Sequence, residues 1–152
     1  MSAERVPGSY RDPGSQVYRL DSRILRALRG DTAKAFRVFA VSGLNDALKE
    51  RSWLVGFEIL EDTATLPPAD LWLEHPRLPV ISHPYEWPFA LLREAAILHL
   101  DVQLLALEHG FKLRDASAYN VQFDRGLPLF IDLPSFAPYR EGEHWFLEGV
   151  YD

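Results

Sequence analysis

The sequence predicts an α+β protein with a strand-rich first half, one long helix and a β-hairpin after that helix. Three observations predict this class. Short runs rich in β-branched and aromatic residues fill the first half, an apolar stretch lies between Pro88 and Gly110, and a turn sequence at 124–126 separates two further apolar runs. The chain has 152 residues, of which 47% are hydrophobic, and this content excludes disorder as its main state.

The first ordered element is expected after a loosely packed leader at residues 1–15, which contains two Pro-Gly dipeptides. Between Gln16 and Leu28, two short runs flank Asp21-Ser22. Their β-branched and aromatic content predicts a strand-turn-strand hairpin, with a helix as the alternative for the second run.

Helical sequence follows the hairpin. Asp31 or Thr32 can cap a helix that runs to about Val41, because its apolar residues recur at helical spacing. Gly43 interrupts this pattern before residues 44–50. We therefore expect one broken helix or two short ones.

The next segments are predicted to be extended. Residues Trp53 to Leu60 and Leu71 to Glu74 read as strands, separated by a loop that contains Pro67-Pro68. Leu78 to Ser82 forms a third extended piece.

The longest predicted element is a helix from Pro88 to His109. Proline fits the first turn of a helix because its missing N–H has no helical partner there, and Gly110 is a typical C-terminal stop. Apolar residues spread around much of this helix, which predicts that other elements cover it on several sides.

A hairpin is predicted after the long helix. Val121 to Phe123 and Leu127 to Ile131 flank the turn Asp124-Arg125-Gly126. If none of these three turn residues takes part in strand pairing, Phe123 lies opposite Leu127 in the hairpin.

Three polar residues interrupt the apolar pattern around this hairpin: Asp115, Asn120 and Asp132. The predicted register places Asp132 diagonally past Asn120, about 7–8 Å away by Cα. Asp115 enters at the same open end, so two carboxylates and one amide oxygen would meet in one cleft and suit Mg²⁺. The structural alternative is that each residue bonds nearby backbone N–H groups, as Asp and Asn often do in turns.

This constellation has the spacing of a phosphotransferase template. The stretch LRDASAYNVQFDRGLPLFIDL resembles the catalytic loop and the metal-binding loop of the protein-kinase-like fold, including small-molecule kinases of the aminoglycoside phosphotransferase type. The resemblance implies that Asp115 is the catalytic base. It also implies that Asn120 and Asp132 are metal ligands that bind Mg, which in turn holds the phosphates of ATP. It also makes Leu78 to Tyr85 the hinge between two lobes.

The sequence departs from that template in its first half, which has no glycine-rich phosphate loop and no strand lysine. Arg26 or Lys49 is the candidate substitute for that lysine. Leu113 stands where many kinases have His or Tyr, and Leu133-Pro134 replaces the usual Phe-Gly.

Longer pieces carry a second resemblance. The stretch LEHPRLPVISHPYEWPFALLREAAILHLDVQLLALEHGFKLRDASAYNVQF, followed by FIDLPSFAPYREGEHW, is similar to the N-terminal region of a bacterial family labelled class I SAM-dependent methyltransferase. In that family a degenerate kinase-like segment precedes the methyltransferase domain. No glycine-rich SAM turn occurs here, so SAM would bind only to a downstream domain that is not in this chain.

The leading hypothesis is therefore a kinase-like N-terminal module that binds or presents substrate and is not catalytic alone. The alternatives are an atypical Mg/ATP-dependent phosphotransferase and a protein-protein interaction module, so enzymatic activity stays open. The expected partner is the downstream methyltransferase domain or another protein chain, and the C-terminal aromatic segment is a candidate homo-oligomer contact.

Composition excludes other classes. The net charge of −6 argues against nucleic acid as a partner. The absence of cysteine excludes disulfides and thiolate metal sites. Neither a signal peptide nor a membrane span is recognisable, which predicts a cytoplasmic protein.

The resemblance implies a truncated protein-kinase-like fold in which a small antiparallel sheet lobe precedes a long helix and a catalytic-type β-hairpin. Residues 1–15 would be a flexible leader, 16–82 a reduced N-terminal lobe and 83–152 a partial C-terminal lobe. Since kinase-like folds continue well beyond the position of Asp132, apolar surface at Phe136 to Tyr151 is expected to be exposed or covered by another chain.

Overall fold

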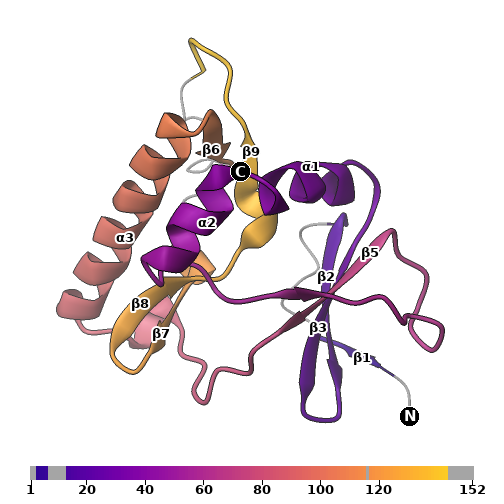
Figure 1. Cartoon of the computed structure of the whole chain (residues 1–152). Coiled ribbons are helices and arrows are strands. Elements are labelled where there is room, and N and C mark those ends of the chain that lie inside the picture. The colour runs from indigo at the N-terminus through magenta and orange to yellow at the C-terminus, as the bar shows by residue number, and fades with distance from the viewer. Residues whose placement is uncertain (1–2, 7–12, 116, 144–152) are drawn as a thin grey trace. The chain divides into compact units, whose positions relative to one another are not determined.

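A computed structural model describes residues 3–6, 13–115 and 117–143, and the chain divides into two compact units (Figure 1). Unit 1 consists of Met1–Arg37 and Gly56–Arg77, and unit 2 consists of Val38–Val55 and Leu78–Asp152. The mixture of antiparallel sheet and helices confirms the α+β class. The chain passes between the units three times, and the third passage, from Arg77 to Leu78, falls at the start of the expected hinge. Residues 38–55 group with unit 2 instead of the expected first lobe.

Unit 1 is built on a five-stranded antiparallel sheet with the order β1-β2-β3-β5-β4. The predicted hairpin is confirmed, and its turn begins at Asp21, whose φ is 54°. Trp72 packs against Tyr18 on one face of the sheet, with 5.1 Å between ring centroids. The strands are β1 (Glu4–Arg5), β2 (Ser15–Leu20), β3 (Arg23–Leu28), β4 (Glu58–Ile59) and β5 (Leu71–His75). An edge strand at Glu4–Arg5 was not expected within the leader, of which residues 1–2 and 7–12 lie outside the described ranges.

Two short helices follow the hairpin, as one of the two predicted alternatives requires. They are α1 (Gly30–Ala40) and α2 (Gly43–Glu50), and Ser42 caps α2 by accepting from the Asn45 N–H. The predicted cap of α1 is wrong. The helix begins at Gly30, whose N–H donates to Asp70, while the Asp31 carboxylate binds Lys34.

The predicted strand Trp53 to Leu60 is confirmed only at Glu58–Ile59, because this apolar run is shared between two sheets. Val55 donates to the Phe130 carbonyl at 2.9 Å, and Phe130 donates to the Trp53 carbonyl at 2.8 Å, so the first part pairs in unit 2. Only Glu58–Ile59 pairs with β5 in unit 1. The predicted strand at Leu71 is confirmed, and Leu78 to Ser82 contains no strand.

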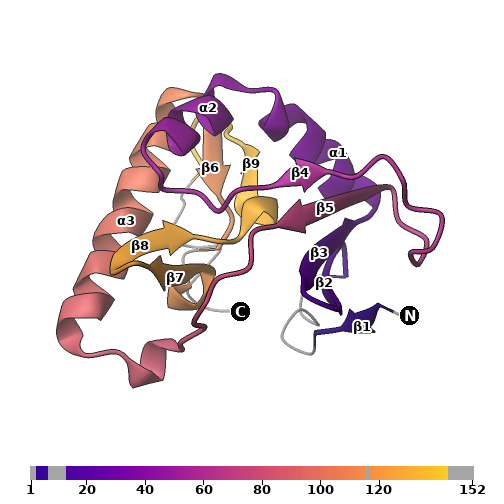
Figure 2. The same ribbon diagram turned by 60° about the horizontal axis from the view of Figure 1, so that its bottom comes forward.

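Unit 2 is organised around the long helix, which lies beside the hairpin of β7 and β8 (Figures 1 and 2). The predicted helix is confirmed: Pro88 is the N-cap, and Gly110, with a φ of 76°, follows the C-cap. The elements are α3 (Phe89–Glu108), β6 (Phe111–Leu113), β7 (Val121–Asp124), β8 (Leu127–Phe130) and β9 (Phe136–Pro138).

The hairpin of unit 2 has a register one residue different from the predicted one. Asp124 lies opposite Leu127, so the turn contains only two residues. Arg125 and Gly126 both have positive φ, 51° and 82°, as the tight turns that suit the twist of β-hairpins require. The predicted pairing of Phe123 with Leu127 is therefore wrong.

Aromatic rings form the core of unit 2. Phe39 stacks on Phe136 at 4.4 Å, and Phe130 meets Phe136 edge-on at 5.6 Å. β9 pairs with β6 and buries Phe136 and Ala137, so the expected exposure of the C-terminal segment is wrong for these two residues. Residues 138–143 are exposed or half-buried, and residues 144–152 lie outside the described ranges.

One face of α3 packs into this core, and the opposite face does not. The residues of the packed face include Leu98, His99 and Val102, whereas Leu100 and Leu104 on the opposite side are exposed. The prediction that elements cover α3 on several sides is therefore wrong. Within the described ranges, none of the helices combines the length and apolarity that a membrane crossing requires.

Candidate functional site

Asp115 lies in the loop that leaves β6, and hydrogen bonds from Ser135 hold this loop in place. The Asp115 N–H donates to Ser135 Oγ at 3.1 Å, and the same hydroxyl donates to the Asp115 carbonyl at 3.3 Å. The Asp115 carboxylate accepts from the Ser117 N–H at 2.7 Å. This carboxylate is half-buried and closes a turn, which is the structural role that the sequence left open.

A backbone hydrogen bond brings the segments of Asn120 and Asp132 together. Ile131 donates to the Asn120 carbonyl at 2.8 Å, and Asp132 follows directly. Asn120 Nδ2 reaches the Asp115 carbonyl at 3.5 Å, so three predicted site segments meet within unit 2. Asp132 precedes a short 3-10 helix and accepts from the Ser135 N–H at 3.1 Å through its carbonyl.

The donor atoms at this loop suit a hard cation. Two carboxylates and one amide oxygen are the ligands that Mg²⁺ prefers, and the bond from Asn120 Nδ2 to Asp115 directs the nitrogen, rather than the oxygen, at the loop backbone. Among the described residues, no three His, Cys, Asp or Glu side chains gather as a metal-binding group. A metal here would therefore need Asn120 in addition to Asp115 and Asp132.

The helix beneath the loop supplies buried polar support. Gln103 Oε1 accepts from the Leu113 N–H at 2.8 Å and so fixes the end of β6. His99 lies one turn earlier and is a buried core histidine, with its Nδ1 at 3.2 Å from the Ala95 carbonyl. Burial lowers the pKa of His99, while the carboxylate of Asp115 acts weakly in the opposite direction.

A frame that the sequence reasoning missed lies beside this loop. Gln122, which is buried in β7, binds both the N–H and the carbonyl of Ser82, at 3.0 and 2.9 Å. Trp87 donates to Ser82 Oγ at 2.8 Å and meets Phe123 edge-on at 5.1 Å. These contacts hold the segment from Ser82 to Trp87 against the hairpin.

The frame presents three aromatic rings to solvent, and we call them the aromatic trio: His83, Tyr85 and Tyr119. The His83 ring stacks on Tyr85 at 5.3 Å and lies 6.5 Å from Tyr119. Tyr85 and Tyr119 are exposed, and Tyr119 precedes Asn120 in sequence. The sequence signal, which covers only His83 and Tyr85, was the ring-bearing stretch around Pro84 and Pro88, where two prolines indicate a rigid segment.

Arg26 and Lys49, the candidate substitutes for the phosphate-binding lysine, are not part of the Asp115 loop. Arg26 lies on β3, where it donates to Ser15 Oγ at 2.9 Å and to His75 Nε2 at 3.3 Å. Lys49 lies on α2 in unit 2. Lysine is absent from all five strands of the unit 1 sheet, so the strand lysine of kinases has no counterpart there.

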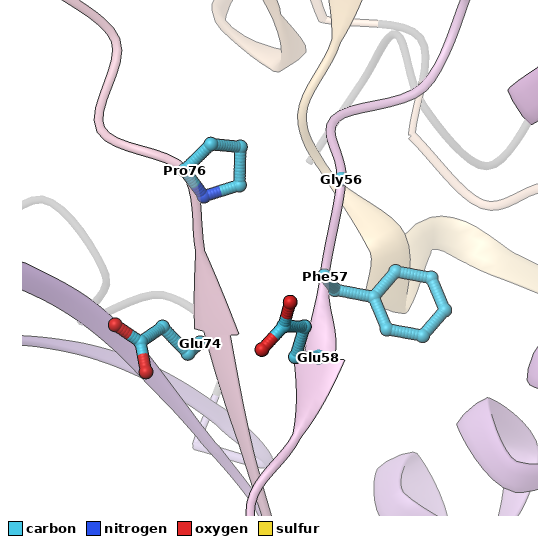
Figure 3. Close-up of a pocket in the computed structure, with 5 residues that line it drawn as sticks. All are labelled: Gly56, Phe57, Glu58, Glu74 and Pro76. Atoms are coloured by element: carbon cyan, nitrogen blue, oxygen red, sulfur yellow. The ribbon is translucent and has the colours of Figure 1, made fainter.

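A pocket in unit 1 is lined by residues of β4, β5 and their flanks (Figure 3). Glu58 and Glu74 are cross-strand partners, and the Phe57 ring points away from their carboxylates. Arg23 Nε binds Glu74 at 2.9 Å, and this bond holds the pKa of Glu74 below its usual value. The pair is a surface ion pair beside a second acid, which on its own defines no chemistry.

Replacing the buried Ser135 with alanine should lower the free energy of unfolding by about 1–3 kcal/mol, because the half-buried Asp115 N–H would lose its acceptor. Urea denaturation measures the loss, and amide exchange should accelerate at Asp115 and Ser117. Ser22→Ala, in an exposed turn, is the matched control and should change stability by less than about 0.5 kcal/mol. Equal effects of the two substitutions would contradict this role of Ser135.

The protein is thus a mixed α/β chain in which the Asp115 loop, held by hydrogen bonds from Ser135, lies beside the exposed rings of the aromatic trio. Among known proteins, the chain is similar to nodulation protein NoeA of Rhizobium meliloti (strain 1021), with 43% identity over 145 residues. The match covers 93% of this chain and 30% of that protein, so the chain spans less than a third of its relative's length. No family model matches the chain.

Proposed function

We propose that this chain is a cytoplasmic, kinase-like module that binds or presents substrate to a SAM-dependent methyltransferase-like domain and has no catalytic activity alone. The observation that carries the proposal is the aromatic trio beside the Asp115 loop. Exposed rings on a fixed frame offer a flat apolar surface to a ligand. The chain also matches only a part of a longer protein, as a module would.

The turn contact of Asp115 and the absence of a strand lysine favour binding over catalysis. The Ser117 N–H holds Asp115 Oδ1 at 2.7 Å, so a proton taken from a substrate would go to the other carboxylate oxygen or to a lone pair beside this bond. Phosphoryl transfer also needs a cation on the phosphates, and the sheet of unit 1 contains no lysine.

An atypical Mg/ATP-dependent phosphotransferase is the second candidate. The observation that favours it is the convergence of the Asp115, Asn120 and Asp132 segments through the bonds of Ser135 and Ile131. In this role Mg²⁺ would supply charge neutralisation for the phosphates, and Asn120 and Asp132 would hold it.

Calorimetric titration of the chain with ATP and Mg²⁺ separates the two candidates. The module proposal expects no binding heat, either for ATP with Mg²⁺ or for SAM. Binding of ATP that requires Mg²⁺ and disappears in Asp132→Ala would establish the phosphotransferase instead. Asp62→Ala, an exposed carboxylate in a loop of unit 1, controls for unspecific loss of charge.

The presenting role itself is tested on a protein that contains both this chain and the proposed methyltransferase-like domain. The proposal expects the reading frame to continue into a domain with a glycine-rich SAM turn. In that protein, Tyr85→Ala with Tyr119→Ala should raise the KM for the methyl acceptor by about tenfold or more and leave kcat nearly unchanged, since uniform binding would be lost. Unchanged KM would refute the role of the aromatic trio.

A further inference from the structure

The solvent side of α3 carries a line of apolar side chains that the described residues leave uncovered. Phe89 is 80% exposed, Leu100 is 53% exposed and Leu104 is 61% exposed, and Ile97 and Leu107 are exposed as well. Single exposed apolar residues are normal on a protein surface, but a row along one helix marks an interaction site. We call this row the outer stripe of α3.

The spacing of the outer stripe suits a partner helix. Ile97, Leu100, Leu104 and Leu107 follow one another at intervals of three, four and three residues. At 100° per residue, these four positions fall within about 80° of one another around the helix. Alternating intervals of three and four are the pattern by which one helix packs its side chains between those of another.

Acidic residues follow one border of the outer stripe. Glu94, Asp101 and Glu108 lie seven residues apart, which places them in one row along the helix. Glu94 pairs with Arg93 at 2.9 Å, whereas Asp101 and Glu108 make no ion pair among the described residues. The other border, at Ala96 and Gln103, has no charge.

We propose that the outer stripe of α3 binds an amphipathic helix of a partner protein whose apolar row is bordered by Lys or Arg. The charge of the acidic border selects this occupant. Two antiparallel copies of α3 would set the acidic borders against each other, and two parallel copies would set them against uncharged residues. An anionic membrane surface would be repelled. The inference does not depend on the substrate-presenting role.

Binding is measured with two synthetic helical peptides of 20 residues, the length of α3, that share a leucine row and differ only in Lys or Glu at its borders. By fluorescence anisotropy, the Lys peptide should bind this chain about tenfold more tightly than the Glu peptide at low salt, because two or three ion pairs separate the two complexes. The difference should shrink as ionic strength rises.

Variants of the chain locate the contact. The double substitution Leu100→Gln with Leu104→Gln should lower the affinity of the chain for the Lys peptide by about tenfold or more, since two apolar contacts are lost. Asp101→Lys with Glu108→Lys should reverse the preference between the peptides. Val41→Gln, which changes an apolar residue that is 87% exposed after α1, is the matched control and should leave binding unchanged.

Three results would overturn the proposal. The first is equal or absent binding of the two peptides. The second is a dimer of the chain alone, seen in sedimentation velocity and lost in Leu100→Gln with Leu104→Gln, because a second copy would then be the occupant. The third is binding to phosphatidylserine vesicles that the same double substitution abolishes, because a membrane surface would then be the occupant.

Discussion

Replacing Phe130 with alanine should lower the free energy of unfolding by about 3–5 kcal/mol, the largest effect of any single substitution that we expect here. Phe130 has no exposed surface and ends β8. Its ring meets Phe136 at 5.6 Å and His99 at 5.5 Å, both edge-on. Alanine would leave a cavity between these rings that the paired backbones around Trp53 and Val55 cannot fill.

Chemical denaturation followed by tryptophan fluorescence measures this loss. Phe89→Ala removes the same ring from a position that is 80% exposed, so it controls for the substitution itself and should cost less than about 1 kcal/mol. A loss below about 1 kcal/mol in Phe130→Ala would show that unit 2 does not depend on this aromatic core. Because Phe130 lies two residues before Asp132, the variant should also accelerate amide exchange in that loop.

Elements with local signals could be predicted from the sequence. The ends of α3 follow from Pro88 and Gly110, because a missing N–H and a left-handed backbone conformation act within one turn of the helix. The hairpin of β2 and β3 follows from two β-prone runs around Asp21. The turn at Arg125 misled the register, because a non-glycine residue at positive φ is rare and was counted as part of a longer loop.

Elements that depend on distant partners could not be predicted. The run from Trp53 to Leu60 looks like one strand, yet its two ends pair with Phe130 and with β5. The pairing of β9 with β6 joins segments that are separated by the whole hairpin. The apolar residues of α3 could not reveal which side is covered, since that depends on what the rest of the chain leaves open.

The candidate site was predicted in part. Asp115, Asn120 and Asp132 were recognised because polar residues stand out in an apolar pattern, and their segments do meet through Ser135 and Ile131. The use of the Asp115 carboxylate in a turn could not be distinguished from a catalytic role, because both require Asp at the same place. The aromatic trio was missed because His83 and Tyr119 are far apart in sequence.

The stability of unit 1 should fall as the pH is lowered from about 6.5 towards 4, and His75 is the cause. Its side chain is buried between the Gly56 carbonyl, 2.9 Å from Nδ1, and Arg26, which donates to Nε2 at 3.3 Å. Burial and then the Arg26 charge lower the pKa of His75 from 6.5 to about 4. A proton on Nε2 would remove the acceptor of Arg26 and place two cations together.

The sign follows from proton binding. Between pH 6.5 and 4 the unfolded chain binds a proton at His75 and the folded chain does not, so acid favours unfolding. The stabilisation is complete above pH 6.5 and its loss approaches roughly 3 kcal/mol near pH 4. Urea denaturation at pH 7.5, 6, 5 and 4.5, values chosen to span about this window, measures the slope.

A matched pair of substitutions separates His75 from the other acid-sensitive groups. Glutamine at position 75 keeps a donor and an acceptor but does not titrate, so His75→Gln should flatten the pH dependence between about 6.5 and 4.5. His109→Gln, at an exposed position, should retain the slope of the original chain. The pKa of buried His99 is also lowered and gives a smaller loss of the same sign in both variants. If His75→Gln keeps the full pH dependence of the unfolding free energy, the acid sensitivity arises from other groups. The neutral His75 side chain, bonded to the Gly56 carbonyl and to Arg26, would then not control the stability of unit 1.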